Sequence, residues 1–177
     1  MKKLILISLM LSLILSALVP ATALAAKPQS FHTDGVISGI EDTVIGDNAF
    51  PAGNSGRWRV IDRQIEGELL SGDITGSFLM NYKANIELAT QAGNLHGTLE
   101  TNEYSFKING KIQPLEMVPI APEVYLPKLT FNGHWTLVDG AQGQGEFNGW
   151  VIFIPDEYGH VVSIIASSFI MHGKWQP

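Results

Sequence analysis

The chain has 177 residues, no cysteine and a formal net charge of −6. The absence of cysteine excludes disulfide bonds and also excludes a lipid anchor attached at a signal-peptide cysteine. An acidic chain is poorly suited to electrostatic binding of nucleic acid or of an anionic membrane. We therefore expect no nucleic-acid partner. We also expect no stable membrane insertion, because an outer-membrane barrel would be apolar on every outward face, whereas Asn81, Lys83, Asn85 and Glu87 are outward and polar.

Residues 1–25 show the three parts of a secretory signal peptide. Lys2 and Lys3 precede an almost unbroken apolar run from Leu4 to Val19, and Ala23-Leu24-Ala25 then supplies the small residues that a signal peptidase accepts. The run is shorter than the roughly 20 residues that span a bilayer as a helix. We predict cleavage after Ala25, a secreted (extracellular or periplasmic) location, and one mature domain at 26–177.

Beyond the signal, apolar and polar residues alternate with a period of two, which is typical of strands with one buried face. The clearest stretch runs from Ile74 to Leu88, and similar stretches cover 129–137 and 145–153. Turn signals such as Ser71-Gly72-Asp73 separate these stretches. The pattern predicts an all-β protein.

A short motif, apolar–polar–Gly–any–apolar, recurs within these strands. Its glycines are Gly67, Gly76, Gly97, Gly110, Gly133, Gly149 and Gly173. Each glycine shares its face with apolar residues and so points inward, where it weakens a strand but permits a sharp bend. We predict a single antiparallel meander β-barrel of about eight strands, a size whose interior is filled by side chains or holds one small ligand.

The segment Gly143-Gln144-Gly145-Glu146-Phe147-Asn148-Gly149 lies close to the C-terminus. A meander of long strands that carries this Gly-x-Gly-x-Phe segment resembles the allene oxide cyclase and dirigent class of barrels, with a likeness in pattern over residues 31–175. The resemblance implies an eight-stranded barrel, a trimer and an apolar small molecule inside, and some members are cyclases or isomerases. No catalytic residue of that class matches a position here. Lipocalin-like barrels are the nearest alternative.

Inward-facing side chains with a polar group or a large ring are candidates for contact with a ligand. They are Glu41, Trp58, Arg63, Tyr82, Tyr104, Trp135, Ser163 and Ser167. Trp58 and Val60 have the opposite parity to Ile61 and Arg63, which predicts a bulge near Ile61. A bulge before Arg63 would turn it inward, where a buried charge needs a partner such as Glu41. The alternative is structural, with Glu41 and Arg63 on a solvated rim and the other residues in the core.

The histidines give no metal signature. His96, His134 and His172 each stand beside a motif glycine and point outward, so they would converge on one ion only if adjacent strands were in matching register. His32 and His160 fall in terminal or loop sequence. The chain also lacks cysteine and the Gly-x-Ser-x-Gly nucleophile motif. We expect no metal site and no cofactor.

Two features indicate contact surfaces. Near the C-terminus, the face that should meet water is apolar, through Trp150, Ile152, Ile154, Val162, Ile164 and Ile170. Strands that are apolar on both faces should not stand bare in water, so we predict an oligomer surface, with coverage by the chain's own loops as the alternative. The proline-rich segment Pro114 to Pro127 is predicted to be a long loop that lids the barrel or reaches a neighbour.

Three classes of function fit these residues. The favoured one is a carrier that binds a small apolar molecule inside the barrel. The second is a cyclase or isomerase in the same cavity, which would use Tyr82, Tyr104, Glu41 or Arg63 as donor, acid or base. The third is a structural or surface-interaction protein with a filled core.

Overall fold

The computed structural model describes residues 27–41, 46–138 and 142–176, and every strand named below lies within these ranges. The described chain is all-β, and its ten strands form one antiparallel sheet. The strands are β1 (Gln29–Ile40), β2 (Ala49–Pro51), β3 (Arg57–Gly72), β4 (Gly76–Glu87), β5 (Gly93–Thr101), β6 (Ser105–Ile112), β7 (Glu116–Ala121), β8 (Val124–Leu137), β9 (Gln142–Pro155) and β10 (Val161–Gln176).

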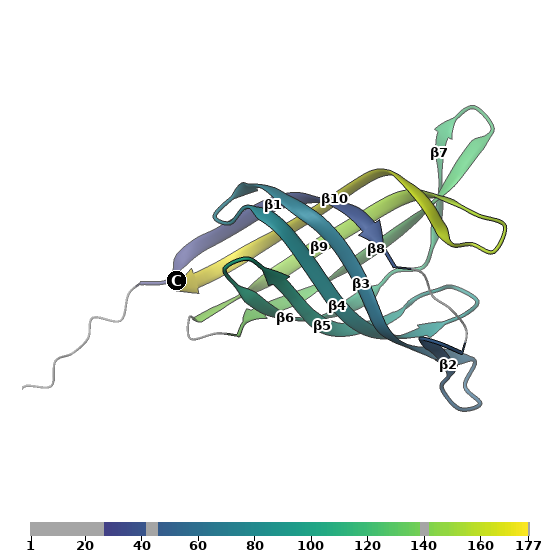
Figure 1. Ribbon diagram of the computed structural model, residues 1–177, viewed down its shortest axis with the longest axis horizontal. Helices are drawn as coiled ribbons and strands as arrows, with labels where there is room; N and C mark the ends of the chain where they lie inside the picture. Colours follow the sequence, from purple (N-terminus) through teal and green to yellow (C-terminus); the bar gives the residue numbers. More distant parts are fainter. Residues whose placement is uncertain (1–26, 42–45, 139–141, 177) are drawn as a thin grey trace, which may run out of the picture.

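Eight of these strands close into a barrel (Figure 1). The order around the wall is β1-β10-β9-β8-β6-β5-β4-β3, and β3 pairs back onto β1. Strands β1 and β10, at opposite ends of the chain, therefore meet side by side and form the seam of the barrel. This arrangement confirms the predicted antiparallel meander. The short strands β2 and β7 lie outside the ring, on β3 and β8 respectively.

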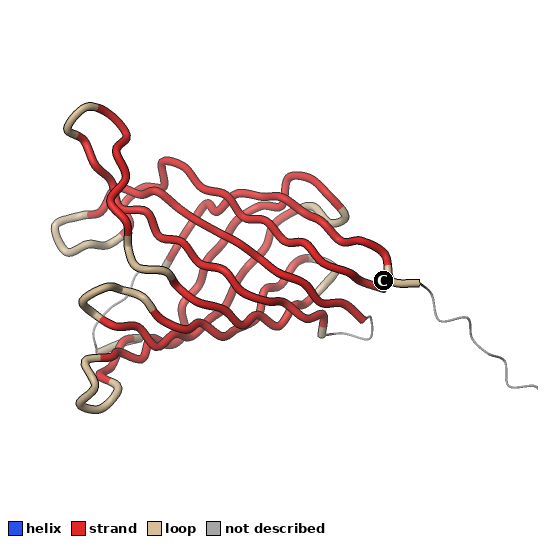
Figure 2. Tube along the Cα trace, turned by 180° about the vertical axis from the view of Figure 1, so that it is seen from behind, coloured by secondary structure: helices blue, strands red, loops and turns tan. Residues whose placement is uncertain are grey.

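The segment expected to be a long loop is instead a hairpin. Strand β7 pairs with the first residues of β8, so that Pro119 lies opposite Tyr125 and Met117 lies opposite Pro127. Proline is tolerated there because β7 is an edge strand, whose outer side needs no backbone donor. The hairpin projects away from the barrel wall (Figures 1 and 2).

Most motif glycines lie directly opposite an aromatic side chain on a neighbouring strand. The pairs are Gly67–Phe78, Gly97–Tyr82, Gly133–Phe147, Gly149–Phe131, Gly149–Phe169 and Gly173–Phe31. A Cβ added to Gly149 would lie 2.5 Å from the Phe131 ring, and one added to Gly67 would lie 2.5 Å from the Phe78 ring. At Gly67 and Gly149, therefore, an aromatic ring from the next strand occupies the space that a side chain would need, whereas at Gly97 and Gly133 the backbone of the adjacent strand lies closest.

We call the end of the barrel that carries the β3–β4 and β5–β6 turns the closed end. Aromatic rings fill it: Phe31 lies 4.9 Å from both Trp135 and Trp175, and Trp135 lies 5.4 Å from Phe106, between ring centroids. The Trp135 Nε1–H is shared between the carbonyl oxygens of Glu146 and His172, at 3.1 and 3.2 Å. A buried indole needs such an acceptor, so Trp135 is a satisfied core residue.

Candidate functional site

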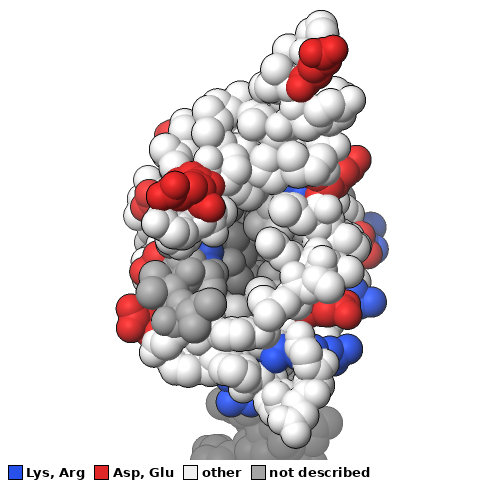
Figure 3. Space-filling model, turned by 90° about the vertical axis from the view of Figure 1, so that its right-hand side faces the viewer, with Lys and Arg blue, Asp and Glu red and all other residues white. Residues whose placement is uncertain are grey.

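We call the opposite end, which carries β2 and the β7–β8 and β9–β10 hairpins, the open end. Figure 3 looks onto this end and shows a hollow in the middle of it. Partly buried side chains pack against the core here, among them Ile40, Tyr82, Ile86, Ile112, Leu115, Leu129, Val161 and Ile164. The open end thus combines an apolar lining with access from outside.

Arg63 reaches the interior because β3 bulges just before it. The register of β3 on β4 shifts between Val60 and Arg63, which confirms the predicted bulge, and Asp62 there has a φ of 50°. Left-handed backbone is costly for most residues, but aspartate adopts it more readily than most. The extra residue lets both Val60 and Arg63 be buried, although the odd spacing between them would place them on opposite faces of a regular strand.

Arg63 is buried without the partner expected for it. The residue is only 8% exposed, and its Nε has no hydrogen-bond partner among the described residues. The ion pairs among those residues all involve histidine, and none involves Arg63. Glu41 is exposed and is held through its backbone, whose N–H donates to the Gln64 carbonyl at 3.0 Å. The predicted Glu41–Arg63 pair is therefore wrong for the described residues.

Tyr82 lies directly opposite Arg63 on β4. Burial raises the pKa of the Tyr82 phenol above its usual range, while Arg63 opposes this shift and Glu41 adds to it. The phenol is therefore protonated at neutral pH and can donate a hydrogen bond beside the guanidinium. Two donors, one of them cationic, thus face the interior of the open end side by side.

Two other predicted contact residues, Trp58 and Ser167, lie at different places in the barrel wall. Trp58 is partly buried opposite Ile86, at the rim of the barrel. The Ser167 hydroxyl accepts from the Ile37 N–H at 2.9 Å and donates to the Ile37 carbonyl at 2.8 Å. Ser167 thus links β1 to β10 beyond their last paired residues, Gly35 and Phe169, so its role is structural.

The prediction of an inward Ser163 is wrong. The register of β10 on β9 shifts between Ile164 and Ala166, so one extra residue reverses the alternation of faces. Ser163 is exposed, Ile164 packs against the core, and Ile165 is 52% exposed. For the same reason Ile164 does not belong to the predicted outer apolar surface.

Tyr104 and Trp135 are not brought to the open end. Both lie in the aromatic packing of the closed end, where the Tyr104 ring is 5.3 Å from Trp175 between centroids. The alternation of residues along a strand predicts which face a side chain points to, and it correctly predicted that Tyr104 and Trp135 point inward like Tyr82. It does not predict how far along the barrel axis a residue lies.

The remaining residues of the predicted outer surface differ in exposure. Ile154 and Val162 are 41% and 66% exposed. Trp150, Ile152 and Ile170 are less exposed, because each is partly buried. The Lys128 ammonium lies 5.4 Å from the Trp150 ring centroid, within the range of a cation–π contact. Further exposed apolar side chains stand on the neighbouring β7–β8 hairpin, namely Met117, Ile120, Val124 and Tyr125.

A shallow groove of about 480 Å³ lies elsewhere, on the outer wall across β1, β3, β4 and β5. Its polar lining includes Ser38, Glu66 and Glu100. Neither Arg63 nor Tyr82 lines it, so it is separate from the site at the open end.

No protein-family model, curated protein or solved structure matches the chain. The resemblance to allene oxide cyclase and dirigent barrels therefore stays a prediction. Among the described residues, no helix has the length and apolar character needed to cross a bilayer. The function is inferred below from the geometry of the open end.

Proposed function

We propose that the protein is a carrier that binds a small molecule with an apolar body and an anionic group at the open end of its barrel. The observation that carries this proposal is the buried Arg63, whose Nε has no partner among the described residues. This refines the expectation of a purely apolar ligand.

The physical argument is one of compensation. A buried charge is costly unless it is paired and hydrogen-bonded. A carboxylate or sulfonate on a ligand would supply that pairing, because the planar guanidinium matches the geometry of two acceptor oxygens. Tyr82 would add a second donor, and the aliphatic lining would hold the apolar body. The ligand class is thus a small amphipathic acid.

A matched pair of fluorescent probes tests the charge requirement. 1-Anilinonaphthalene-8-sulfonate and N-phenyl-1-naphthylamine share their aromatic rings, but only the first carries a sulfonate. We expect the wild-type protein to bind the anionic probe about tenfold or more tightly than the neutral one, since a charge-assisted contact contributes about 1.5–3 kcal/mol. Fluorescence titration of each probe measures this ratio.

Arg63→Met should abolish the preference for the anionic probe while retaining binding of the neutral probe. Arg59→Met, on the exposed face of the same strand, is the matched control and should keep the wild-type ratio. Equal binding of both probes by the wild-type protein, or an unchanged ratio in Arg63→Met, would show that the proposal is wrong.

We also propose that the protein self-associates through β10 and the adjacent hairpins, with a trimer favoured by the resemblance. Val162, Ile165 and Ile154 are exposed and apolar, and residues 161–171 contain no Asp, Glu, Lys or Arg. Identical copies can therefore meet there without like-charge repulsion, and burial of this apolar surface would favour association.

Light scattering coupled to size exclusion measures the mass of the assembly. The double substitution of Val162→Ser and Ile165→Ser should yield a monomer, whereas Leu70→Ser, at an exposed apolar residue near the closed end, should leave the mass unchanged. A monomeric wild-type protein would rule out self-association.

A further inference from the structure

Four of the chain's five histidines lie in one row on the outer wall of the barrel. His32 on β1 is directly opposite His172 on β10, and His172 is directly opposite Glu146 on β9. Glu146 is in turn opposite His134 on β8. The row continues through Asn109 on β6 to His96 on β5. Adjacent strands thus have the matching register that a shared ion would require.

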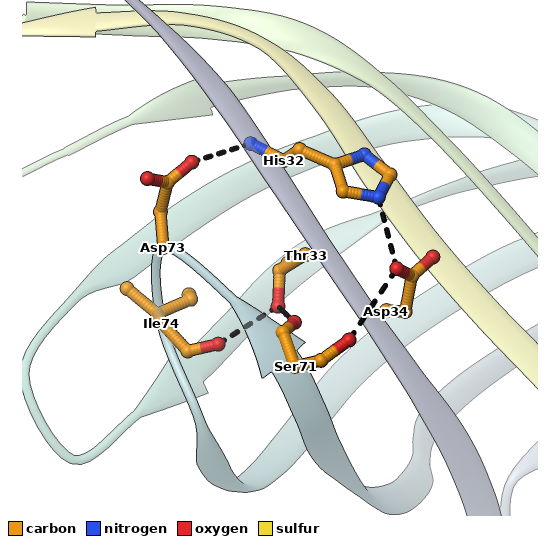
Figure 4. A network of polar contacts seen from close by, with 6 residues as sticks. All are labelled: His32, Thr33, Asp34, Ser71, Asp73 and Ile74. Atoms are coloured by element: carbon orange, nitrogen blue, oxygen red, sulfur yellow. Dashed lines mark hydrogen bonds and ion pairs between the residues drawn. The ribbon is translucent and has the colours of Figure 1, made fainter.

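The part of this row at the seam between β1 and β10 is rich in potential ligands. Asp34 lies two residues beyond His32 on the same face of β1, and its Oδ2 is 2.9 Å from His32 Nε2 (Figure 4). Glu146 Oε2 is 3.4 Å from His172 Nε2. Two imidazoles and two carboxylates are therefore neighbours here, with side-chain exposures of 44–61%.

General sheet geometry permits these side chains to reach a common ion. Cβ atoms of directly opposite residues are about 4.5–5.5 Å apart, and residues i and i+2 on one strand are about 6.6–6.8 Å apart. In the conformations of the structure, no three His, Asp or Glu side chains of the described residues already form a metal-binding group. Exposed side chains change rotamer within picoseconds to nanoseconds, so binding requires only side-chain rotation.

We propose that His32 and His172, with Asp34 and Glu146, bind a divalent transition-metal ion across the seam, and that zinc is the best fit. Imidazole nitrogen and carboxylate oxygen are both ligands that zinc accepts in a tetrahedral site. Imidazole also selects such ions over calcium and magnesium, which prefer all-oxygen sites. This proposal replaces the expectation of no metal, and it does not depend on a ligand at the open end.

The position of the site gives the ion a structural effect. His32 and His172 stand on the first and last strands of the barrel, and these strands come together only on folding. An ion that binds only the folded arrangement stabilises it by mass action. Zinc should therefore cross-link β1 and β10 at the seam and raise the melting temperature of the protein.

Isothermal titration with zinc chloride tests the site on the mature secreted chain, purified without a polyhistidine tag. His32→Gln and His172→Gln should each weaken zinc binding at least about tenfold, since loss of even an outer-shell partner weakens binding by about 10–100-fold. Both variants should also lose the zinc-dependent rise in melting temperature. Asp34→Asn should weaken binding less than either histidine substitution.

His96→Gln is the matched control. His96 stands in the same row and is also exposed, but its direct neighbour is Asn109, whose Oδ1 is 2.7 Å from His96 Nδ1. This variant should bind zinc as the wild-type protein does. The proposal is overturned if the wild-type protein shows no zinc-dependent stabilisation, if His172→Gln binds zinc as tightly as wild type, or if His96→Gln loses binding to the same extent.

Discussion

The two ends of this barrel are built from the same strands but in opposite ways. At the closed end, Phe31, Phe106 and Trp135 are at most 1% exposed, and their rings pack edge to face. At the open end the lining is mostly aliphatic and partly buried, and it includes the unpaired Arg63 Nε.

The difference indicates that the closed end contributes mainly to stability and the open end mainly to function. A cysteine-free barrel must gain its stability from burial, and the aromatic closed end supplies much of that burial. An uncompensated buried charge at the open end is a cost to stability, and such costs are characteristic of functional sites. The predictions below test whether stability and function are separated along the barrel axis in this way.

The largest effect is expected at the closed end. Trp135→Ala should lower the free energy of unfolding by about 3–5 kcal/mol, because it opens a cavity in a packed core. The matched substitution at the open end, Trp58→Ala, should cost less than half as much, since Trp58 is already partly exposed at the rim. Urea denaturation measures both values, and equal losses would contradict the comparison.

The pairing of glycines with aromatic rings is tested by Gly149→Ala. The added methyl group would stand 2.5 Å from the Phe131 ring, so we expect a loss of about 1–3 kcal/mol from overpacking. Gly143→Ala is the control, because its Cβ would come no closer than 3.1 Å to another atom and should cost less. Combining Gly149→Ala with Phe131→Leu should recover part of the loss, and strict additivity would argue against the pairing.

At the open end, by contrast, we expect a substitution to stabilise the protein. Arg63→Met removes a buried charge that has no partner among the described residues, so it should raise the free energy of unfolding by about 1 kcal/mol or more. The same variant should lose the preference for an anionic probe. A destabilised Arg63→Met variant would mean that the guanidinium is part of the structural core.

The smallest effect concerns pH. The pKa of Tyr82 is raised in the folded state, chiefly by burial, so folding is favoured while the phenol is protonated in both states. Stability is then lost as the pH rises above about 10, where the unfolded phenol ionises, and through the higher pKa of the folded state. Tyr82→Phe should show a shallower fall in melting temperature between about pH 9 and 11. Tyr158→Phe, at an exposed tyrosine, is the control and should follow the wild-type profile.

One part of the candidate site, the inward direction of Arg63, which lies opposite Tyr82, could be anticipated from local pattern. The switch of parity between Val60 and Arg63 predicted a bulge, and the structure has it at Asp62. A bulge placed before Arg63 predicted that Arg63 faces inward, with a solvated rim as the alternative, and the structure buries Arg63. The partner of Arg63 could not be predicted from local pattern, and the expected Glu41 was wrong, because the position of Glu41 depends on how β1 ends against β3.

The errors have a common origin. The register shift in β10 between Ile164 and Ala166 falls at three consecutive apolar residues, so the alternation of polar and apolar residues does not show which of them is the extra one. Ser163 and Ile164 were consequently assigned to the wrong faces. The β7–β8 hairpin was likewise hidden by its prolines, which are compatible with a strand only when that strand lies at an edge.

The sequence alone determined the all-β class, the inward glycines and the eight-stranded meander, because alternation and glycine spacing are local properties of each strand. Only the tertiary structure decided which residues of neighbouring strands these side chains contact. Register places rings opposite the glycines and closes one end, and it also places His32 beside His172 although 140 residues separate them. Register is set by the closure of the whole barrel, and no single strand contains that information.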